Sequence, residues 1–281
     1  MNLFSYVVGR FEDGARSGVP RFDYSLRRVF PGIRSVIKPE FSAGATVITD
    51  NHLSLNVPED LRTIVVHHGC AAAHFARDIE WHTEHTATIA RLQEDMFKKP
   101  NRSYVAPSSW VAQVFRQWYE PAGYEPAIIP HWVEFIPRNR ANREKHVIIG
   151  DWRDPNKGLN IWRNLASHCP QYEFRPLCFS TQEEKKEIYG SASLYLCLSL
   201  SEGGSYSMCD AEAAELPIVS TNVGNYREFD DCQMIDWRKR DQVDYVAGAI
   251  EEKLLAGRYK ESFYKTYPYE CWHEKWQAMA R

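Results

Sequence analysis

"LSLSEGGSYSMCDAEAAELPIVSTNVGNYREF", residues 198–229, predicts a strand, a loop, a short helix and a second strand. The apolar run before the loop and the run "PIVSTN" after the helix are both typical of buried parallel strands. Glu202 stands at the carboxyl end of the first strand, and Asp210 follows just beyond the expected helix start. Ligands of open parallel sheets bind at such strand ends. The stretch therefore predicts an α/β fold and a binding site within it.

The same alternation of strand and helix patterns runs along the whole chain, which favours an α/β fold with mostly parallel sheets. In the first half we expect strands at 3–8, 45–50, 63–68 and 102–107, and helices near 20–30, 75–98 and 109–119. In the second half we expect strands at 146–152, 173–178, 194–200, 217–222 and 233–237, and a helix at 243–255.

Residues 136–145, "IPRNRANREK", are polar and lack apolar periodicity, which is typical of a loop between domains. We therefore expect two Rossmann-like lobes, residues 1–135 and 136–265. The tail, residues 266–281, reads as a helix with Trp272 and Trp276 on one side that packs back on the first lobe.

Composition narrows the class of protein. The chain has 281 residues, of which 44% are hydrophobic and 25% charged, and its net charge is −3, so we expect a globular protein and no nucleic-acid partner. Its seven cysteines form no CxxC pair, which argues against a disulfide framework. With no leader pattern and no apolar run of about 20 residues, we expect a cytoplasmic protein.

The loop at Glu202 has the chemistry of a phosphate and sugar site. Gly203, Gly204 and Ser205 follow the acid, and the helix should begin near Tyr206. A helix start offers backbone N–H groups and a dipole to an anion, and glycines allow a ligand close to the backbone. Carboxylates accept hydrogen bonds from neighbouring hydroxyls. The combination suits a nucleotide sugar.

These residues resemble the E-G-F-G-x-x-x-x-E signature of retaining glycosyltransferases with the GT-B fold, the large family-four type. Three further segments follow the family order: "VAPSSWVAQVF", "AIIPHWVEF" and "GDWRDPNKGLNIW", the last similar to the phosphate-binding G-R-x-x-x-x-K-G. The resemblance implies two Rossmann-like lobes facing a cleft, with a C-terminal helix crossing back. It also implies transfer from a nucleoside-diphosphate sugar with retention of configuration, and no metal or other cofactor.

The resemblance also implies roles in the second lobe. Glu202 would lie beside the transferred sugar. Asp210, one methylene shorter than the usual Glu, would bind the ribose hydroxyls, with Glu212 as an out-of-register alternative. Lys157 would meet the diphosphate, and Arg153 could bind two phosphate oxygens beside it. Fixed cations stabilise a departing diphosphate most in the transition state.

In the first lobe, His68, or else His67, ends a strand where relatives place a histidine towards the donor sugar and acceptor. Gly18 matches a small residue that touches the diphosphate or the acceptor. Other interpretations remain open: a packed core histidine, a simple turn glycine, and a zinc site. The histidines that a zinc site could use are His67, His68, His74, His82 and His85, but no HExxH or CxxC pattern accompanies them.

Several points stay open. The second glycine of the signature is shifted by one place. Residues 172–192 have room for one strand–helix unit, where the family commonly has two, and the missing unit normally forms part of the nucleobase pocket. The donor could therefore be of UDP or GDP type. The acceptor could be a glycan, a lipid-linked sugar, a protein or a small molecule. Alternatives are an epimerase, an inverting transferase, or a silent carbohydrate-binding protein. A basic helix with an apolar stripe (Phe22, Leu26, Val29) leaves peripheral membrane contact open.

Overall fold

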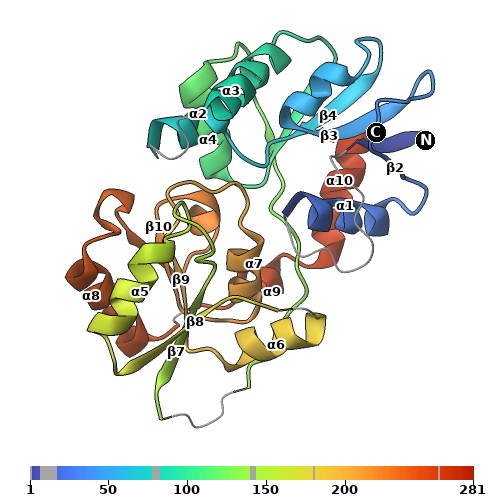
Figure 1. Cartoon of the computed structure of the whole chain (residues 1–281). Coiled ribbons are helices and arrows are strands. Elements are labelled where there is room, and N and C mark those ends of the chain that lie inside the picture. Colours follow the sequence, from blue (N-terminus) through green and yellow to red (C-terminus); the bar gives the residue numbers. More distant parts are fainter. Residues whose placement is uncertain (1, 7–17, 78–82, 140–143, 180, 259) are drawn as a thin grey trace. The chain divides into compact units, whose positions relative to one another are not determined.

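A computed structural model describes residues 2–6, 18–77, 83–139, 144–179, 181–258 and 260–281. Packing contacts divide the chain into two compact units. The first unit comprises Met1–His131 and Tyr269–Arg281, and the second comprises Trp132–Pro268. Each unit is an α/β structure with its own parallel sheet, as the alternating patterns predicted (Figure 1).

The first unit contains a six-stranded sheet in the order β2-β1-β3-β4-β5-β6, and every pairing in it is parallel. Its strands are β1 (Leu3–Tyr6), β2 (Arg34–Val36), β3 (Thr46–Asp50), β4 (Arg62–Val66), β5 (Arg102–Ala106) and β6 (Ala127–Ile128). Its helices are α1 (Gly18–Val29), the 3-10 helix η1 (Asn51–Asn56), α2 (Ala71–Arg77), α3 (Glu84–Met96), α4 (Ser109–Tyr119) and α10 (Tyr269–Ala280).

The long helix expected near 75–98 is two helices in the structure. Thr83 begins the second helix, α3, because its side-chain oxygen accepts a hydrogen bond from the Thr86 N–H at 3.1 Å. Helix α4 matches its expected bounds, and Ser108 caps it in the same way through the Val111 N–H. The spacing of apolar residues in 109–119 predicts a buried face made of Val111, Val114, Phe115 and Trp118. The first three are buried, but Trp118, in the last turn, is 43% exposed and lines a surface pocket.

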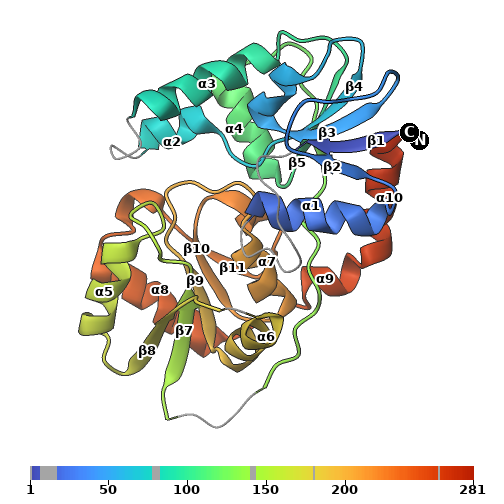
Figure 2. The ribbon, with the colours of Figure 1, turned by 45° about the vertical axis from the view of Figure 1, so that its right-hand side comes forward.

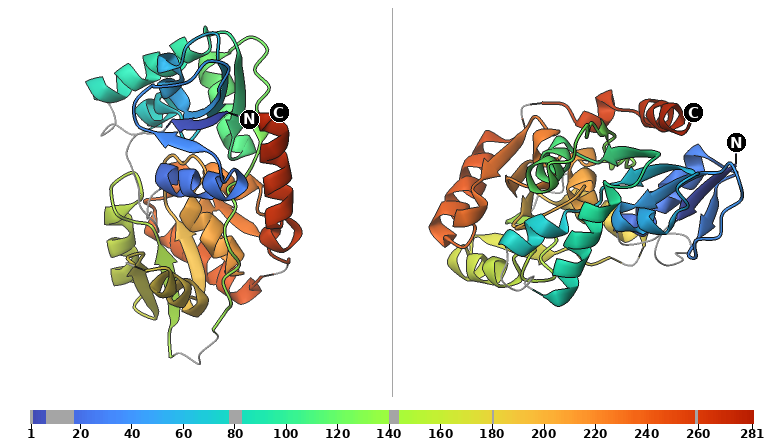
Figure 3. Two further views of the ribbon diagram at one scale, coloured as in Figure 1. Left: turned by 90° about the vertical axis from the view of Figure 1, so that its right-hand side faces the viewer. Right: turned by 90° about the horizontal axis from the view of Figure 1, so that it is seen from above.

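The C-terminal helix α10 packs on the first unit. Trp272 and Trp276 are buried, and the Trp276 ring lies 5.4 Å from the ring of Phe22 on α1. Arg62 donates hydrogen bonds to the carbonyl oxygens of Met279 and Ala280. Helices α1 and α10 therefore lie side by side within this unit (Figures 2 and 3).

The second unit contains a five-stranded parallel sheet in the order β11-β10-β9-β7-β8. Its strands are β7 (His146–Gly150), β8 (Tyr172–Pro176), β9 (Leu194–Cys197), β10 (Ile218–Thr221) and β11 (Cys232–Ile235). Its helices are α5 (Leu159–His168), α6 (Gln182–Ser191), α7 (Tyr206–Ala213), the 3-10 helices η3 (Gly224–Arg227) and η4 (Trp237–Lys239), α8 (Val243–Ala256) and α9 (Phe263–Thr266).

Helices cover both faces of this sheet, with α5 and α8 on one side and α6, α7 and α9 on the other (Figure 1). Between α5 and β9 the described residues form one strand, β8, and one helix, α6, which confirms the expectation of a single strand–helix unit there. Thr181 and Glu184 form a capping box that starts α6.

A tryptophan anchors the core of the second unit directly after β7. The fully buried Trp152 stacks on Trp162 at 5.6 Å and donates a hydrogen bond to the Leu196 carbonyl oxygen. Gly150 makes room for it, since a Cβ there would come within 2.4 Å of both the Trp152 ring and the Leu196 oxygen. The segment that follows β7 is thereby held against β9.

Part of the segment expected to be a loop between domains is bonded to the second unit. The Ile136 N–H donates to the Ala213 carbonyl oxygen, and Arg138 donates to the carbonyl oxygens of Ala192 and Glu215. Residues 132–139 therefore belong to the second unit, and residues 140–143 lie outside the described part of the chain.

Candidate functional site

The order of strands in the second unit predicts where a ligand binds. Strand β8 pairs with one edge of β7, and the next strand along the chain, β9, pairs with the other edge. The direction of winding therefore reverses between β7 and β9, and ligands of open α/β sheets bind beyond the carboxyl ends of strands at such a switch point. The segments that follow these two strands are 151–158 and 198–205. They contain Arg153, Lys157 and Glu202, which were expected to bind the donor.

The structure brings three of the predicted residues together at this point. Lys157 Nζ contacts Glu202 Oε1 in an ion pair, and it lies 3.9 Å from Asp151 Oδ2. Arg153 donates two hydrogen bonds to Asp151, from Nε at 2.7 Å and from Nη2 at 2.8 Å. Two cations and two carboxylates thus form one cluster, which we call the charge cluster: Asp151, Arg153, Lys157 and Glu202.

Burial and charge act in opposite directions on Lys157. Its side chain is 18% exposed, and burial alone would lower the pKa of the ammonium group. The negative charges of Glu202 and Asp151, together with the hydrogen bond to Glu202, outweigh burial and raise the pKa. The hydrogen bonds to Asp151 likewise raise the pKa of Arg153. Both cations are therefore fully charged at neutral pH, as a phosphate site requires.

Hydrogen bonds fix the two segments that carry the cluster to each other. The Asn156 side chain bonds to both the N–H and the carbonyl oxygen of Ser201. Arg240 donates to the carbonyl oxygens of Pro155, Asn156 and Leu198. Because the guanidinium of Arg240 satisfies carbonyls of both segments, Lys157 and Glu202 are held in place before any ligand arrives.

The Glu202 side chain is positioned from two sides. Ser199 Oγ donates a hydrogen bond of 2.6 Å to Glu202 Oε1. On the other side lies Gly224, whose backbone has a φ of +64° and where a Cβ would come 2.8 Å from the Cβ of Glu202. Only a glycine combines this conformation with this approach. The sequence patterns did not single out Ser199 or Gly224, because both act through contacts that are distant along the chain or within a turn.

The loop after Glu202 leads into α7 as expected. Gly203 is buried and Gly204 half-buried, and Tyr206 begins the helix. Ser205 caps it, accepting a hydrogen bond from the Met208 N–H at 3.4 Å. The Ser205 N–H in turn donates to the side-chain oxygen of Asn225 at 2.9 Å. That N–H group is therefore occupied within the protein.

The structure gives Asp210 a different partner from the expected ribose. Its carboxylate lies 3.2 Å from the Lys185 ammonium group of α6, and both side chains are almost fully buried. Glu212, the alternative, binds Arg258 through both carboxylate oxygens and also accepts the Phe263 N–H. Both acids therefore hold helices together inside the unit, because buried carboxylates are found with a compensating partner.

The two histidines at the end of β4 differ in their surroundings. His67 is fully buried, its ring stacks on Phe115 at 3.9 Å, and its Nδ1 lies 3.0 Å from the Asn51 side-chain oxygen. Burial lowers the pKa of His67 to about 3. This is a packed core histidine, the alternative interpretation given above.

His68 is half-buried in the first unit. Its ring lies edge-on to Phe22 at 4.9 Å and stacks on His131 at 5.6 Å, and burial lowers its pKa to about 4. The imidazole is therefore neutral at pH 7 and can act through a hydrogen bond but not through a positive charge. Its Nε2 is buried without a hydrogen-bond partner among the described residues.

Asp50, at the end of β3, is a further polar group in this part of the first unit. Burial raises the pKa of its carboxyl group to about 7, although the His68 N–H bonds to it and partly offsets the shift. Its Oδ1 is buried and has no hydrogen-bond partner in the described structure. Gly18 begins α1, and residues 7–17, which precede it, lie outside the described residues.

Two other sequence hypotheses can be compared with the described residues. No group of three or more His, Cys, Asp or Glu side chains among them is arranged to hold a metal ion, and His82 is not among these residues. The apolar stripe of α1 (Phe22, Leu26, Val29) is buried in the first unit, so it is not available to a membrane. None of the helices in the described ranges has the length and apolarity needed to cross a bilayer.

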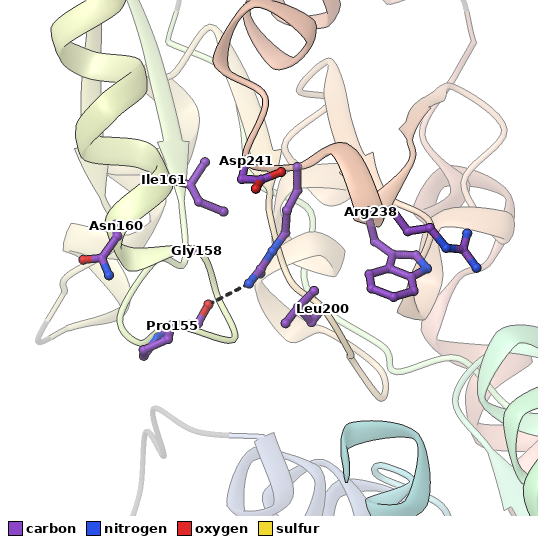
Figure 4. A pocket seen from close by; sticks show the side chains of 9 residues that line it. Pro155, Gly158, Asn160, Ile161, Leu200, Arg238 and Asp241 are labelled. Carbon is purple, nitrogen blue, oxygen red and sulfur yellow. Dashed lines mark hydrogen bonds between the residues drawn. The ribbon is translucent and has the colours of Figure 1, made fainter. Parts of the chain in front are cut away.

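A pocket of about 370 Å³ opens next to the segments of the charge cluster (Figure 4). It is lined by Pro155, Gly158, Asn160, Ile161, Leu200, Trp237, Arg238, Arg240 and Asp241. Two of the lining residues are joined by the hydrogen bond from Arg240 to the Pro155 carbonyl oxygen, drawn as a dashed line in Figure 4. Its volume falls within the range of about 300–1,000 Å³ that is usual for small-molecule pockets.

No family model matches the sequence, and no curated protein matches it either. Solved structures do resemble the chain. Sucrose-phosphate synthase from Thermosynechococcus elongatus has a TM-score of 0.70 at 10% identity, over 100% of this chain and 95% of its own. Alr3699/HepE from Anabaena, in complex with UDP, has a TM-score of 0.67 at 10% identity, over 99% of both chains.

WaaG, a glycosyltransferase involved in lipopolysaccharide biosynthesis, resembles the chain with a TM-score of 0.61 at 13% identity, over 100% of this chain and 95% of its own. At such low identities the likeness establishes the fold alone. The fold extends over the whole chain in each comparison, as the signature around Glu202 predicted. The chain therefore has the GT-B fold, and the structures that it resembles over its full length are those of GT-B glycosyltransferases.

Proposed function

We propose that this protein is a glycosyltransferase that takes a sugar from a nucleoside-diphosphate sugar and transfers it to a hydroxyl-bearing acceptor with retention of anomeric configuration. The observation that carries the proposal is the ion pair of Lys157 and Glu202 at the switch point of the second sheet. A cation for the diphosphate and a carboxylate for sugar hydroxyls stand together where an α/β sheet binds its ligand.

The geometry of the charge cluster supports the following roles for its residues. Lys157 and Arg153 bind the diphosphate and stabilise the charge that grows on it as the bond to the sugar breaks. Glu202 gives up part of its contact with Lys157 and accepts hydrogen bonds from the sugar. Gly203, Gly204, Ser205 and Tyr206 form the loop and helix start beneath the phosphate. The UDP bound to the Anabaena structure is consistent with a donor of this type.

Asp210 is proposed to hold α7 to α6 through Lys185, and it is not assigned to the ribose. His68 is proposed to contact the donor sugar or the acceptor as a neutral hydrogen-bonding group of the first unit. The leaving diphosphate is the base that takes the acceptor proton in this proposal. It needs no metal among the reacting groups, because Lys157 and Arg153 carry the charge that a metal would supply.

Turnover of a panel of sugar nucleotides tests the proposal. Release of the nucleoside diphosphate from UDP-, GDP-, ADP- and dTDP-sugars should occur for one nucleotide, should persist in EDTA, and should be lost in Lys157→Ala. Lys145→Ala removes an exposed lysine that bonds only to the Pro170 carbonyl oxygen among the described residues, and it should leave the rate unchanged. NMR of the product should show the anomeric configuration of the donor; the opposite anomer would refute retention.

A second candidate is a carbohydrate-binding protein that does not turn over a donor. The internal charge balance of the cluster favours it, because it leaves the site less cationic than a diphosphate requires. The buried pair favours it too, because Lys185 occupies the carboxylate of Asp210 that was expected to bind the ribose. Binding of free sugars or glycans without release of a nucleoside diphosphate from any of the four donors would support this alternative.

A further inference from the structure

Asp151 faces both cations of the charge cluster, accepting two hydrogen bonds from Arg153 and lying within ion-pair distance of Lys157. Its side chain is only 9% exposed, whereas that of Arg153 is 62% exposed. Arg153 uses Nε and Nη2 on the carboxylate, and Lys157 Nζ is 3.9 Å away. Gly150 and Trp152, which flank Asp151, are fixed against β9, so the carboxylate cannot move far.

The charges of the four residues of the charge cluster cancel before a ligand arrives. Asp151 and Glu202 balance Arg153 and Lys157, and Asp154 adds a further carboxylate, which accepts the Lys157 N–H at 3.0 Å. Lys157 is already paired with Glu202. A phosphate is bound best by two N–H groups of one guanidinium, and in Arg153 one such pair faces Asp151. A phosphate must therefore compete with Asp151 for Arg153.

We propose that Asp151 sets the affinity of the donor site for phosphate groups: it holds Arg153 and Lys157 in the empty site and repels the diphosphate that they bind. The inference rests on the proposed function and adds to it a residue that controls how tightly the diphosphate is held. The diphosphate is also the product that must leave after transfer, and product release sets the rate of many enzymes. Asp151 therefore favours release of the product nucleoside diphosphate and lowers the affinity of the site for it.

The isosteric change Asp151→Asn tests this directly, because it removes the charge and keeps the shape. The site opens to solvent at Arg153, so screening reduces the repulsion, and we expect binding of inorganic pyrophosphate and of UDP or GDP to become about tenfold tighter. Asp151→Glu, which keeps the charge, should bind pyrophosphate like the wild type. The gain should be smaller when Arg153→Ala is combined with Asp151→Asn, because competition for Arg153 is one part of the effect.

The chain offers a matched control. Glu173 and Arg175 stand two residues apart on β8, as Asp151 and Arg153 do after β7, and their hydrogen bond of 2.6 Å is exposed. Glu173→Gln should leave the affinity for pyrophosphate unchanged. Titration calorimetry at low ionic strength measures all variants, and circular dichroism shows that each is folded.

Equal or weaker pyrophosphate binding by folded Asp151→Asn would overturn the inference, and so would the absence of pyrophosphate binding by both the wild type and this variant. A gain for pyrophosphate, with no nucleoside diphosphate bound by either protein, would refute the proposed function but support the role of Asp151. A gain for both pyrophosphate and one nucleoside diphosphate supports both.

Discussion

Asp210 could have a structural role, through its buried ion pair with Lys185, or a ligand-binding role. The two roles predict different effects of substituting Asp210 on stability and on nucleotide affinity. The two side chains are 1% and 6% exposed, and the charged atoms lie 3.2 Å apart. Asp210→Asn would remove the negative charge that lies 3.2 Å from the buried Lys185 ammonium group. Breaking a buried pair from one side costs about 3–5 kcal/mol, because the remaining charge stays out of water. We expect a loss of that size in the free energy of unfolding.

Urea unfolding of the full-length chain, followed by circular dichroism, measures the loss. The double variant Asp210→Leu with Lys185→Met should recover most of it, since apolar residues of similar volume can replace a buried pair at little cost. The control is Asp230→Asn, which breaks the exposed pair with Lys260 and should cost at most about 1 kcal/mol. Affinity for nucleoside diphosphates should change little in folded Asp210→Asn. Unchanged stability together with a tenfold loss of that affinity would refute this reasoning and return Asp210 to the ribose.

Three further results are expected. Gly224→Ala should destabilise the protein by about 1–3 kcal/mol and lower transfer activity, because the added Cβ would meet Glu202. The control Gly248→Ala, whose Cβ would have nothing within 4 Å, should be neutral or stabilising. Equal effects of the two changes would contradict the positioning role of Gly224. The folded protein keeps the Asp50 proton up to about pH 7, whereas the unfolded chain loses it near pH 4, so the stabilisation is complete below pH 4 and is lost as the pH rises through 7. The stability of wild type minus that of Asp50→Asn should therefore fall by a few kcal/mol between pH 4 and 8 in urea titrations, and a constant difference would contradict it. Glu202→Gln should lower the pKa of Lys157, read by NMR of its ammonium group, and should abolish sugar transfer; an unchanged pKa would show that the ion pair does not hold the lysine charged.

The sequence predicted the parts of the site that depend on local pattern and strand order. Glu202 and Lys157 each follow a strand of the second sheet, and parallel strands bring their carboxyl ends to the same edge, so their meeting could be expected. The single strand–helix unit between α5 and β9 followed from chain length alone. These features need only the alternation of elements and the position of residues at their ends.

The parts of the site that the sequence did not predict depend mostly on contacts between residues far apart in sequence. Lys185 lies on α6, and nothing in its local pattern shows that it pairs with Asp210 on α7. Asp151 and Arg153 are only two residues apart, but their pairing depends on the turn that Gly150 and Trp152 impose after β7. The choice between His67 and His68 required knowledge of which strand face is packed, because both follow the same apolar run.

The central claim is that the switch point of the second unit holds a nucleoside diphosphate on Lys157 and Arg153. Calorimetric titration of the metal-free protein with UDP, GDP, ADP, dTDP and CMP tests it most directly. The account predicts that one diphosphate binds at micromolar concentration and that Lys157→Ala weakens it at least tenfold, while Lys145→Ala does not. Binding of none of these nucleotides, or binding that Lys157→Ala leaves unchanged, would contradict it.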